Sequence, residues 1–72
     1  MKLSYYPETD SLYIDLSAQS SVESTEVSPG IVLDYDADYN LVGIDIDNAS
    51  QKLDLKELSL QKLPFEAQTL SA

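Results

Sequence analysis

Apolar and polar residues alternate along the first two-thirds of the chain, and turn-forming residues interrupt the alternation at short intervals. Alternation places successive side chains on opposite faces of an extended strand. The pattern predicts five short strands, over residues 2–6, 11–16, 22–27, 31–35 and 41–46. Each strand has one apolar face, which is typical of an antiparallel sheet that is covered on one side.

The apolar faces of these strands predict the core. Five aliphatic side chains are expected to be buried together on one side of the sheet: Leu12, Ile14, Leu33, Ile44 and Ile46. Gly43 lies inside the last strand, which indicates a bulge or the close approach of a bulky neighbour. The strand over 22–27 carries two glutamates, which suit an edge that must avoid pairing with other chains.

Turn residues separate the strands. Pro7 and Asp10 favour a turn after the first strand, and Pro29-Gly30 favours one before the fourth. In the connection between the last two strands, Asn40 is the residue expected to adopt the left-handed conformation that such connections often need.

The alternation is lost over residues 48–65, and two capping pairs stand in its place. Asn48 with Gln51, and Asp54 with Glu57, resemble the capping box that begins a helix. We therefore expect one or two short helices, the second ending before Pro64.

A strand over 58–60 fits the same residues, and helix is the preferred interpretation. Residues 66–72 are expected to fray. The fold class predicted is mainly β (α+β): one domain over 1–72, with a small antiparallel β-meander of about five strands over 1–47 and a short helical segment over 48–65.

The chain has 72 residues and no cysteine or histidine, which excludes disulfides and zinc sites built on thiolates or imidazoles. Small domains that lack both often gain stability from a partner subunit. The leucines of the C-terminal third do not share one helical face, so Leu55, Leu58 and Phe65 are expected to point outward. An outward apolar cluster favours a twofold homodimer.

The net charge is −9, from 13 acidic and 4 basic residues. Such a surface repels phosphate backbones and anionic lipids, so neither nucleic acid nor membrane is an expected partner. It suits simple solubility, cation binding or a small basic protein partner. The N-terminal segment has no apolar run of signal-peptide length, so we expect a soluble, cytoplasmic protein.

The sequence lacks the residues of conventional active sites. Without histidine, cysteine or arginine it cannot form a Ser-His-Asp or Cys-His triad or clamp a phosphate bidentately, and its two glycines lie too far apart for a phosphate loop. We therefore predict no catalytic residue, no cofactor and no enzymatic activity.

Carboxylates are the remaining candidate ligands. The weak candidates for a divalent-cation site are Asp34, Asp36, Asp38 and Asp45. The alternating acids resemble the start of an EF-hand loop, but Tyr39 stands at the glycine position and Asp45 at the glutamate position. A solvated sheet face is the preferred interpretation.

Three blocks of residues, in order, carry a family resemblance. Tyr5–Ile14 resembles the opening of small bacterial proteins grouped as domain of unknown function 2283, with the approximate pattern Tyr-Asp-Pro-Glu-x-Asp-x-Leu-Tyr-Ile. Glu26–Asp36 resembles that family's Val-x-Pro-Gly-Ile followed by Asp-Tyr-Asp. Val42–Ile46, with Asn48–Ser50, resembles its Val-Gly-Ile-Glu-Ile followed by Asp-Ala-Ser.

The resemblance covers about residues 1–53 and implies a compact β-meander with a short C-terminal helix, but no activity. The chain departs from the family pattern at Tyr39, where a turn glycine is common, and at Asp45, which replaces a glutamate. Members of this family are often encoded beside another small protein, in an arrangement that resembles toxin–antitoxin pairs. The function predicted is a non-catalytic, antitoxin-like interaction module; the alternative is a carboxylate-based cation-binding domain.

Overall fold

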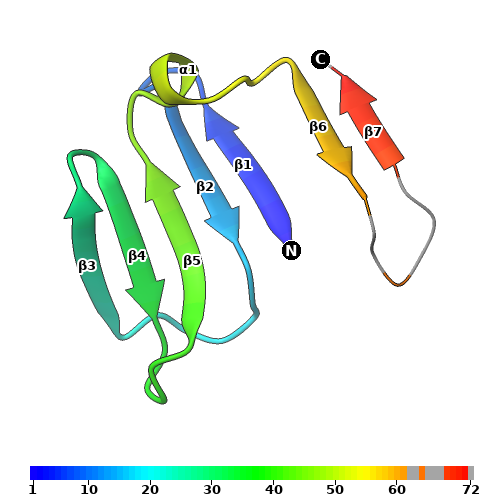
Figure 1. Cartoon of the computed structure of the whole chain (residues 1–72). Helices are drawn as coiled ribbons and strands as arrows, with labels where there is room; N and C mark the ends of the chain where they lie inside the picture. The colour runs from blue at the N-terminus through cyan, green and yellow to red at the C-terminus, as the bar shows by residue number, and fades with distance from the viewer. Residues whose placement is uncertain (62–63, 65–67, 72) are drawn as a thin grey trace.

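A computed structural model describes residues 1–61, residue 64 and the backbone of 68–71. Five strands form one antiparallel sheet: β1 (Lys2–Tyr6), β2 (Ser11–Asp15), β3 (Glu23–Ser28), β4 (Ile31–Tyr35) and β5 (Leu41–Ile46). All five strands predicted from the alternation are confirmed, within a residue at each end. The mainly β fold class is confirmed with them (Figure 1).

The strands lie in the order β1-β2-β5-β4-β3. The last three form a meander, whereas β2 pairs with β5, so the connection after β2 carries the chain to the far edge of the sheet (Figure 1). The edge position expected for β3 is confirmed, and all six of its residues are exposed.

The strand registers align the apolar side chains in two rows across the sheet. Leu3 pairs with Ile14, Ile14 with Ile44, and Ile44 with Leu33. A second row runs in the same way from β1 to β4. We call these eight residues the apolar face: Leu3, Tyr5, Leu12, Ile14, Ile31, Leu33, Ile44 and Ile46.

Much of the apolar face is only partly covered. Leu12 and Ile46, each 7% exposed, pack with Ala49 at one end of the sheet. The other three predicted core residues, Ile14, Leu33 and Ile44, are half-buried rather than buried. The prediction of five buried side chains is thus wrong in part. A short helical turn covers the end of the sheet where Leu12 and Ile46 lie, and Ile14, Leu33 and Ile44 lie farther from it.

That turn is α1 (Ala49–Lys52), and a distant residue caps it. The predicted cap, Asn48, makes no side-chain capping hydrogen bond and lies in the left-handed region with φ 52°. Asp10 takes this role from 40 residues away: its Oδ1 accepts the Ser50 N–H at 3.1 Å and its Oδ2 accepts the Ser50 hydroxyl at 2.7 Å. The Tyr5 hydroxyl also donates to Asp10 Oδ1, at 2.7 Å.

This cap predicts an acid-sensitive stability. The hydrogen bonds from Ser50, and then from Tyr5, lower the pKa of Asp10 below its ordinary value of 3.8. A carboxyl with a lowered folded-state pKa stabilises the fold above pH 3.8, and this stabilisation is lost as the pH falls through the lower value. Thermal unfolding of Asp10→Asn is expected to show a lower melting temperature at neutral pH and a smaller further loss between pH 5 and 2 than the unchanged protein. An unchanged acid profile would contradict this role; Asp38→Asn, in an exposed loop, is the matched control.

Turn residues explain both hairpins of the meander. Gly30 follows Pro29 with φ 75°, a conformation that favours glycine. In the β4–β5 connection the left-handed residue is Tyr39, with φ 63°, and not Asn40 as predicted. The Asp36 carboxylate instead accepts the backbone N–H groups of Asp38 and Asn40, each at 2.9 Å.

Tyr39 is therefore a strained position whose side chain is 74% exposed. Tyr39→Gly is expected to raise the free energy of unfolding by about 0.5–1 kcal/mol, because glycine adopts positive φ without the clash of a Cβ. Urea denaturation measures the change, with Ala37→Gly as the control in the same loop. A loss of stability in Tyr39→Gly would show that the ring contributes a contact worth more than the strain.

The C-terminal segment forms a second, two-stranded sheet. β6 (Glu57–Leu60) pairs antiparallel with β7 (Gln68–Ser71). The predicted second helix is wrong, because Leu58 and Leu60 alternate with polar residues and find a strand partner later in the chain. Asp54 does not begin a helix; its side chain accepts the Lys56 N–H at 3.0 Å in a turn.

The expected frayed tail is wrong for Gln68–Ser71, which pair as β7; residues 66, 67 and 72 lie outside the described residues, as does Phe65. Within the described part of the chain, no helix has the length and apolar character needed to cross a membrane.

Candidate functional site

The polar face of the sheet is organised around Tyr13. Its ring lies over Gly43 of the neighbouring strand: a Cβ on Gly43 would overlap the Tyr13 hydroxyl and lie 2.6 Å from Cζ. The hydroxyl donates to Asp34 Oδ2 at 2.8 Å, and the Ser24 hydroxyl donates to Asp34 Oδ1 at 2.6 Å. The close approach predicted at Gly43 is confirmed. The register shift between Asp34 and Tyr35 of β4 also leaves Val42, next to Gly43, as an extra residue in β5.

The bond to Asp34, together with burial and the negative charges of Asp34, Asp15 and Asp45, raises the pKa of Tyr13 to about 12. A tyrosine with a raised folded-state pKa stabilises the fold below the ordinary value of 10, and this stabilisation is lost as the pH rises from 10 through 12. Ultraviolet titration is expected to show a late-ionising tyrosine that disappears in Tyr13→Phe and moves toward pH 10 in Asp34→Asn. Tyr6→Phe is the control. Titration of all tyrosines together near pH 10 would contradict the bond.

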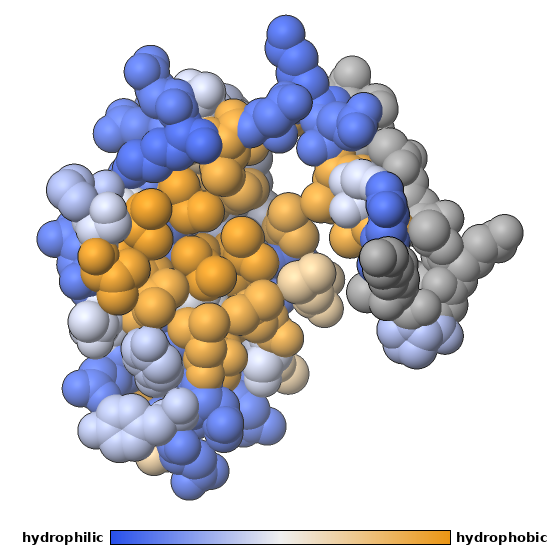
Figure 2. All heavy atoms as spheres, in the orientation of Figure 1, coloured by the Kyte–Doolittle hydropathy of each residue, from blue (hydrophilic) through white to orange (hydrophobic). Residues whose placement is uncertain are grey.

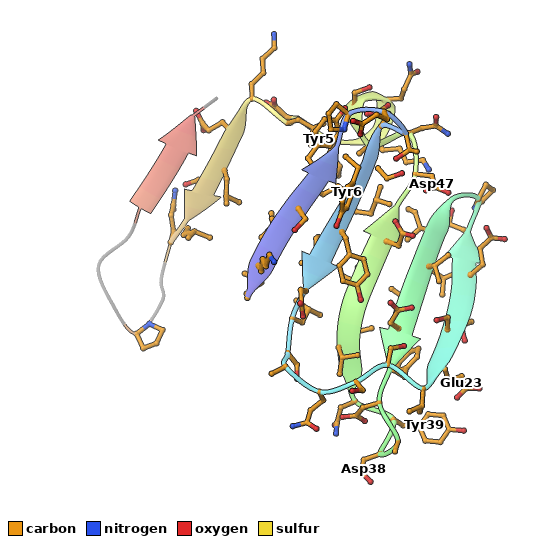
Figure 3. All side chains as sticks on the ribbon, turned by 180° about the vertical axis from the view of Figure 1, so that it is seen from behind. Tyr5, Tyr6, Glu23, Asp38, Tyr39 and Asp47 are labelled. Carbon is orange, nitrogen blue, oxygen red and sulfur yellow. The ribbon has the colours of Figure 1, made fainter. Side chains whose placement is uncertain are left out.

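The four candidate cation ligands do not converge. Asp34 is engaged by Tyr13 and Ser24, and the Asp36 carboxylate closes its own loop, where the Asn40 N–H lowers its pKa. Asp38 projects from the tip of that loop, at the opposite end of the sheet from Asp47 (Figure 3). Among the residues that the structure describes, no three acidic side chains are grouped so that they could hold a metal ion.

Asp45 is the fourth candidate, and it shares the polar face with Asp34. Burial, and then the charges of Asp47 and Asp34, raise its pKa above the ordinary value. The carboxylates of Asp34, Asp45 and Asp47 repel one another because they share the polar face. This repulsion does not make them a set of metal ligands.

A large hollow in the described part of the chain lies on the other side of the sheet. The apolar face continues into a groove of about 870 Å³, which separates β1 and β2 from the segment that leads into β6. Figure 2 shows apolar residues gathered on this side and extending toward the C-terminal segment. We call this hollow the apolar groove; it is lined by Leu3, Tyr5, Leu12, Ile14 and residues 53–58.

The C-terminal leucines face the sheet across this groove. Leu55 packs against the Leu12–Ile46–Ala49 cluster, and Leu53 and Leu58 line the hollow. The prediction that Leu55 and Leu58 point outward is wrong. The chain turns at Asp54–Lys56 and presents these leucines inward, a change of direction that no helical or strand periodicity indicates.

Sequence reasoning also missed the groove. The signal was present in β1, where Leu3 and Tyr5 belong to an apolar stripe on an edge strand. Leu3 is 41% and Tyr5 44% exposed, because no described element covers them.

Comparison with known proteins identifies a family. The family model described as "Protein of unknown function (DUF2283)" matches residues 2–50, which span all five strands of the main sheet and the start of α1. No curated protein and no solved structure matches the chain. The β6–β7 hairpin lies beyond the matched residues.

Proposed function

The chain belongs to the DUF2283 family of proteins of unknown function, and from this premise we propose that it is a non-catalytic protein-interaction module that binds through the apolar groove. The observation that supports the proposal is an apolar sheet face that continues, largely uncovered, into a groove of about 870 Å³. Contiguous exposed apolar surface on a small domain commonly marks an interaction site.

The lining of the groove favours binding over chemistry. The walls are aliphatic, and the charged residues among them, Asp54, Lys56 and Glu57, are exposed. Tyr5 also lines the groove, and its hydroxyl donates a hydrogen bond to Asp10. A catalytic site needs several polar groups aimed at one point, whereas aliphatic walls suit apolar side chains of another polypeptide.

The test asks whether the groove is open to a small apolar probe or is already occupied by another protein chain. Fluorescence of the neutral dye Nile red reports accessible apolar surface, and light scattering on the same samples reports the mass. We expect either dye binding by a monomer, reduced in Leu3→Glu and unchanged in Val22→Glu, or an associated form that excludes the dye. A monomer that does not bind the dye would contradict the proposal.

The antitoxin-like role and the small basic partner expected from the sequence stay predictions. Such a partner would contact the acidic polar face, and co-purification of the chain with a basic neighbour from its own cells tests it. The cation alternative is tested by a Ca²⁺-selective rise in melting temperature that is absent at matched ionic strength.

A further inference from the structure

We propose that the partner in the apolar groove is a second copy of this chain, paired about a twofold axis with the apolar faces of both copies in the interface. This inference rests on the proposed function and names its partner. Three observations favour a second copy: the distribution of charge over the two faces, the amount of exposed surface, and the contrast between the two sheet edges.

Charge is segregated between the two faces of the sheet. On the strands of the main sheet, Asp15, Asp34, Asp45 and Glu26 occupy polar-face positions, and Glu23 is the acidic residue on the other side, at the β3 edge. The far wall of the groove adds Asp54, Lys56 and Glu57, whose charges nearly cancel. A chain of net charge −9 can approach an identical chain only through a surface that carries little of that charge. The apolar face is such a surface, and pairing through it keeps the acidic faces outside.

The exposed area fits the same conclusion. The chain exposes 5487 Å², whereas a folded monomer of 8.0 kDa is expected to expose about 4,450 Å². The excess of about 1,000 Å² is close to the area of about 800 Å² that each partner contributes to a stable interface of standard size.

The two edges of the sheet differ in what borders them. β3 carries Glu23 and Glu26 and is followed by Pro29, features that block association at an edge. β1 carries Lys2 and is followed by Pro7, which protect an edge in the same way, but it borders the groove and has Leu3 and Tyr5 exposed on its apolar side. An isolated two-stranded hairpin such as β6–β7 is also marginal in water. A second copy at the β1 side would therefore cover the exposed Leu3 and Tyr5, the groove and the inward side of the hairpin together.

The experiment is sedimentation or light scattering of the full chain across a series of protein and salt concentrations. We expect a dimer at high micromolar concentration, with tighter association as salt screens the net charge. Leu3→Glu places a carboxylate in the groove and is expected to weaken the dimer at least about a hundredfold. Val22→Glu adds the same charge at an exposed position on the opposite edge and is expected to leave the dimer intact.

Circular dichroism verifies that each variant folds, and Leu58→Glu, on the hairpin side of the groove, replaces Leu3→Glu if that variant does not. Equal weakening by Leu3→Glu and Val22→Glu would overturn the proposal, and so would a wild-type monomer at high micromolar concentration and moderate salt. Dye binding by that monomer would leave the interaction groove intact and exclude only the second copy. A monomer without dye binding would exclude both.

Discussion

Truncating Ile46 to alanine is expected to remove a large share of the protein's free energy of unfolding. Ile46 is 7% exposed, and its register partners are Leu12 on β2 and Ile31 on β4. Removing three carbons from such a site costs about 2–5 kcal/mol, and a domain of this size has a total stability of only about 4–11 kcal/mol. Urea denaturation followed by circular dichroism measures the loss.

A graded series provides the control for this prediction. Ile44→Ala removes the same atoms from a half-buried position, and Leu3→Ala removes a side chain that is 41% exposed. The losses are expected to fall in the order Ile46, Ile44, Leu3, because the transfer term scales with the apolar area buried. An equal loss for Leu3→Ala and Ile46→Ala in dilute protein would mean that the groove is closed in the isolated chain.

Adding a single methyl group at Gly43 is expected to destabilise the sheet by about 1–3 kcal/mol. Gly43 lies in β5 between β2 and β4, and the new Cβ would overlap the Tyr13 hydroxyl. The ring can escape only by lifting from the sheet, which breaks its bond to Asp34. Thermal unfolding of Gly43→Ala measures the effect.

A double-mutant cycle separates this explanation from a general intolerance of the site. A Tyr13→Ala background removes the three atoms nearest to the new methyl group, and alanine in place of glycine within a strand is then expected to stabilise by about 0.5–1 kcal/mol. The effect of Gly43→Ala should therefore change sign when the ring is absent. If the substitution is equally harmful in both backgrounds, the backbone of β5 itself requires glycine.

These contacts connect the fold to its proposed role. The polar face forms its own contacts. The Tyr13 ring covers the backbone at Gly43, and the Tyr13 hydroxyl links β2 to β4 through its hydrogen bond to Asp34. Among the described residues, α1 and Leu55 cover part of the opposite face and leave Leu3 and Tyr5 exposed. Tyr13 and Asp34 of the polar face are therefore hydrogen-bonded within the sheet, whereas apolar side chains of the opposite face are exposed. Such exposure is expected of a domain that binds another chain.

Local patterns in the sequence determined the five strands and their outward and inward faces. Alternation in Leu12–Ile14 and Ile44–Ile46 identifies an apolar side, Pro29-Gly30 identifies a turn, and Gly43 signals a close neighbour, since each of these depends on steric rules within a few residues. The glutamates of β3 indicated an edge for a similar reason: unpaired backbone groups there need protection.

Tertiary structure alone decided which strands became neighbours and which residues met. β2 pairs with β5, Asp10 caps a turn that begins 39 residues later, and β6 finds its partner in β7, all through contacts between segments that no local period connects. The groove follows from the same cause, because the turn at Asp54–Lys56 aims Leu55 and Leu58 back at the sheet without covering Leu3 and Tyr5. Periodicity assigns a side chain to a face, but the packing of distant segments determines whether that face is covered.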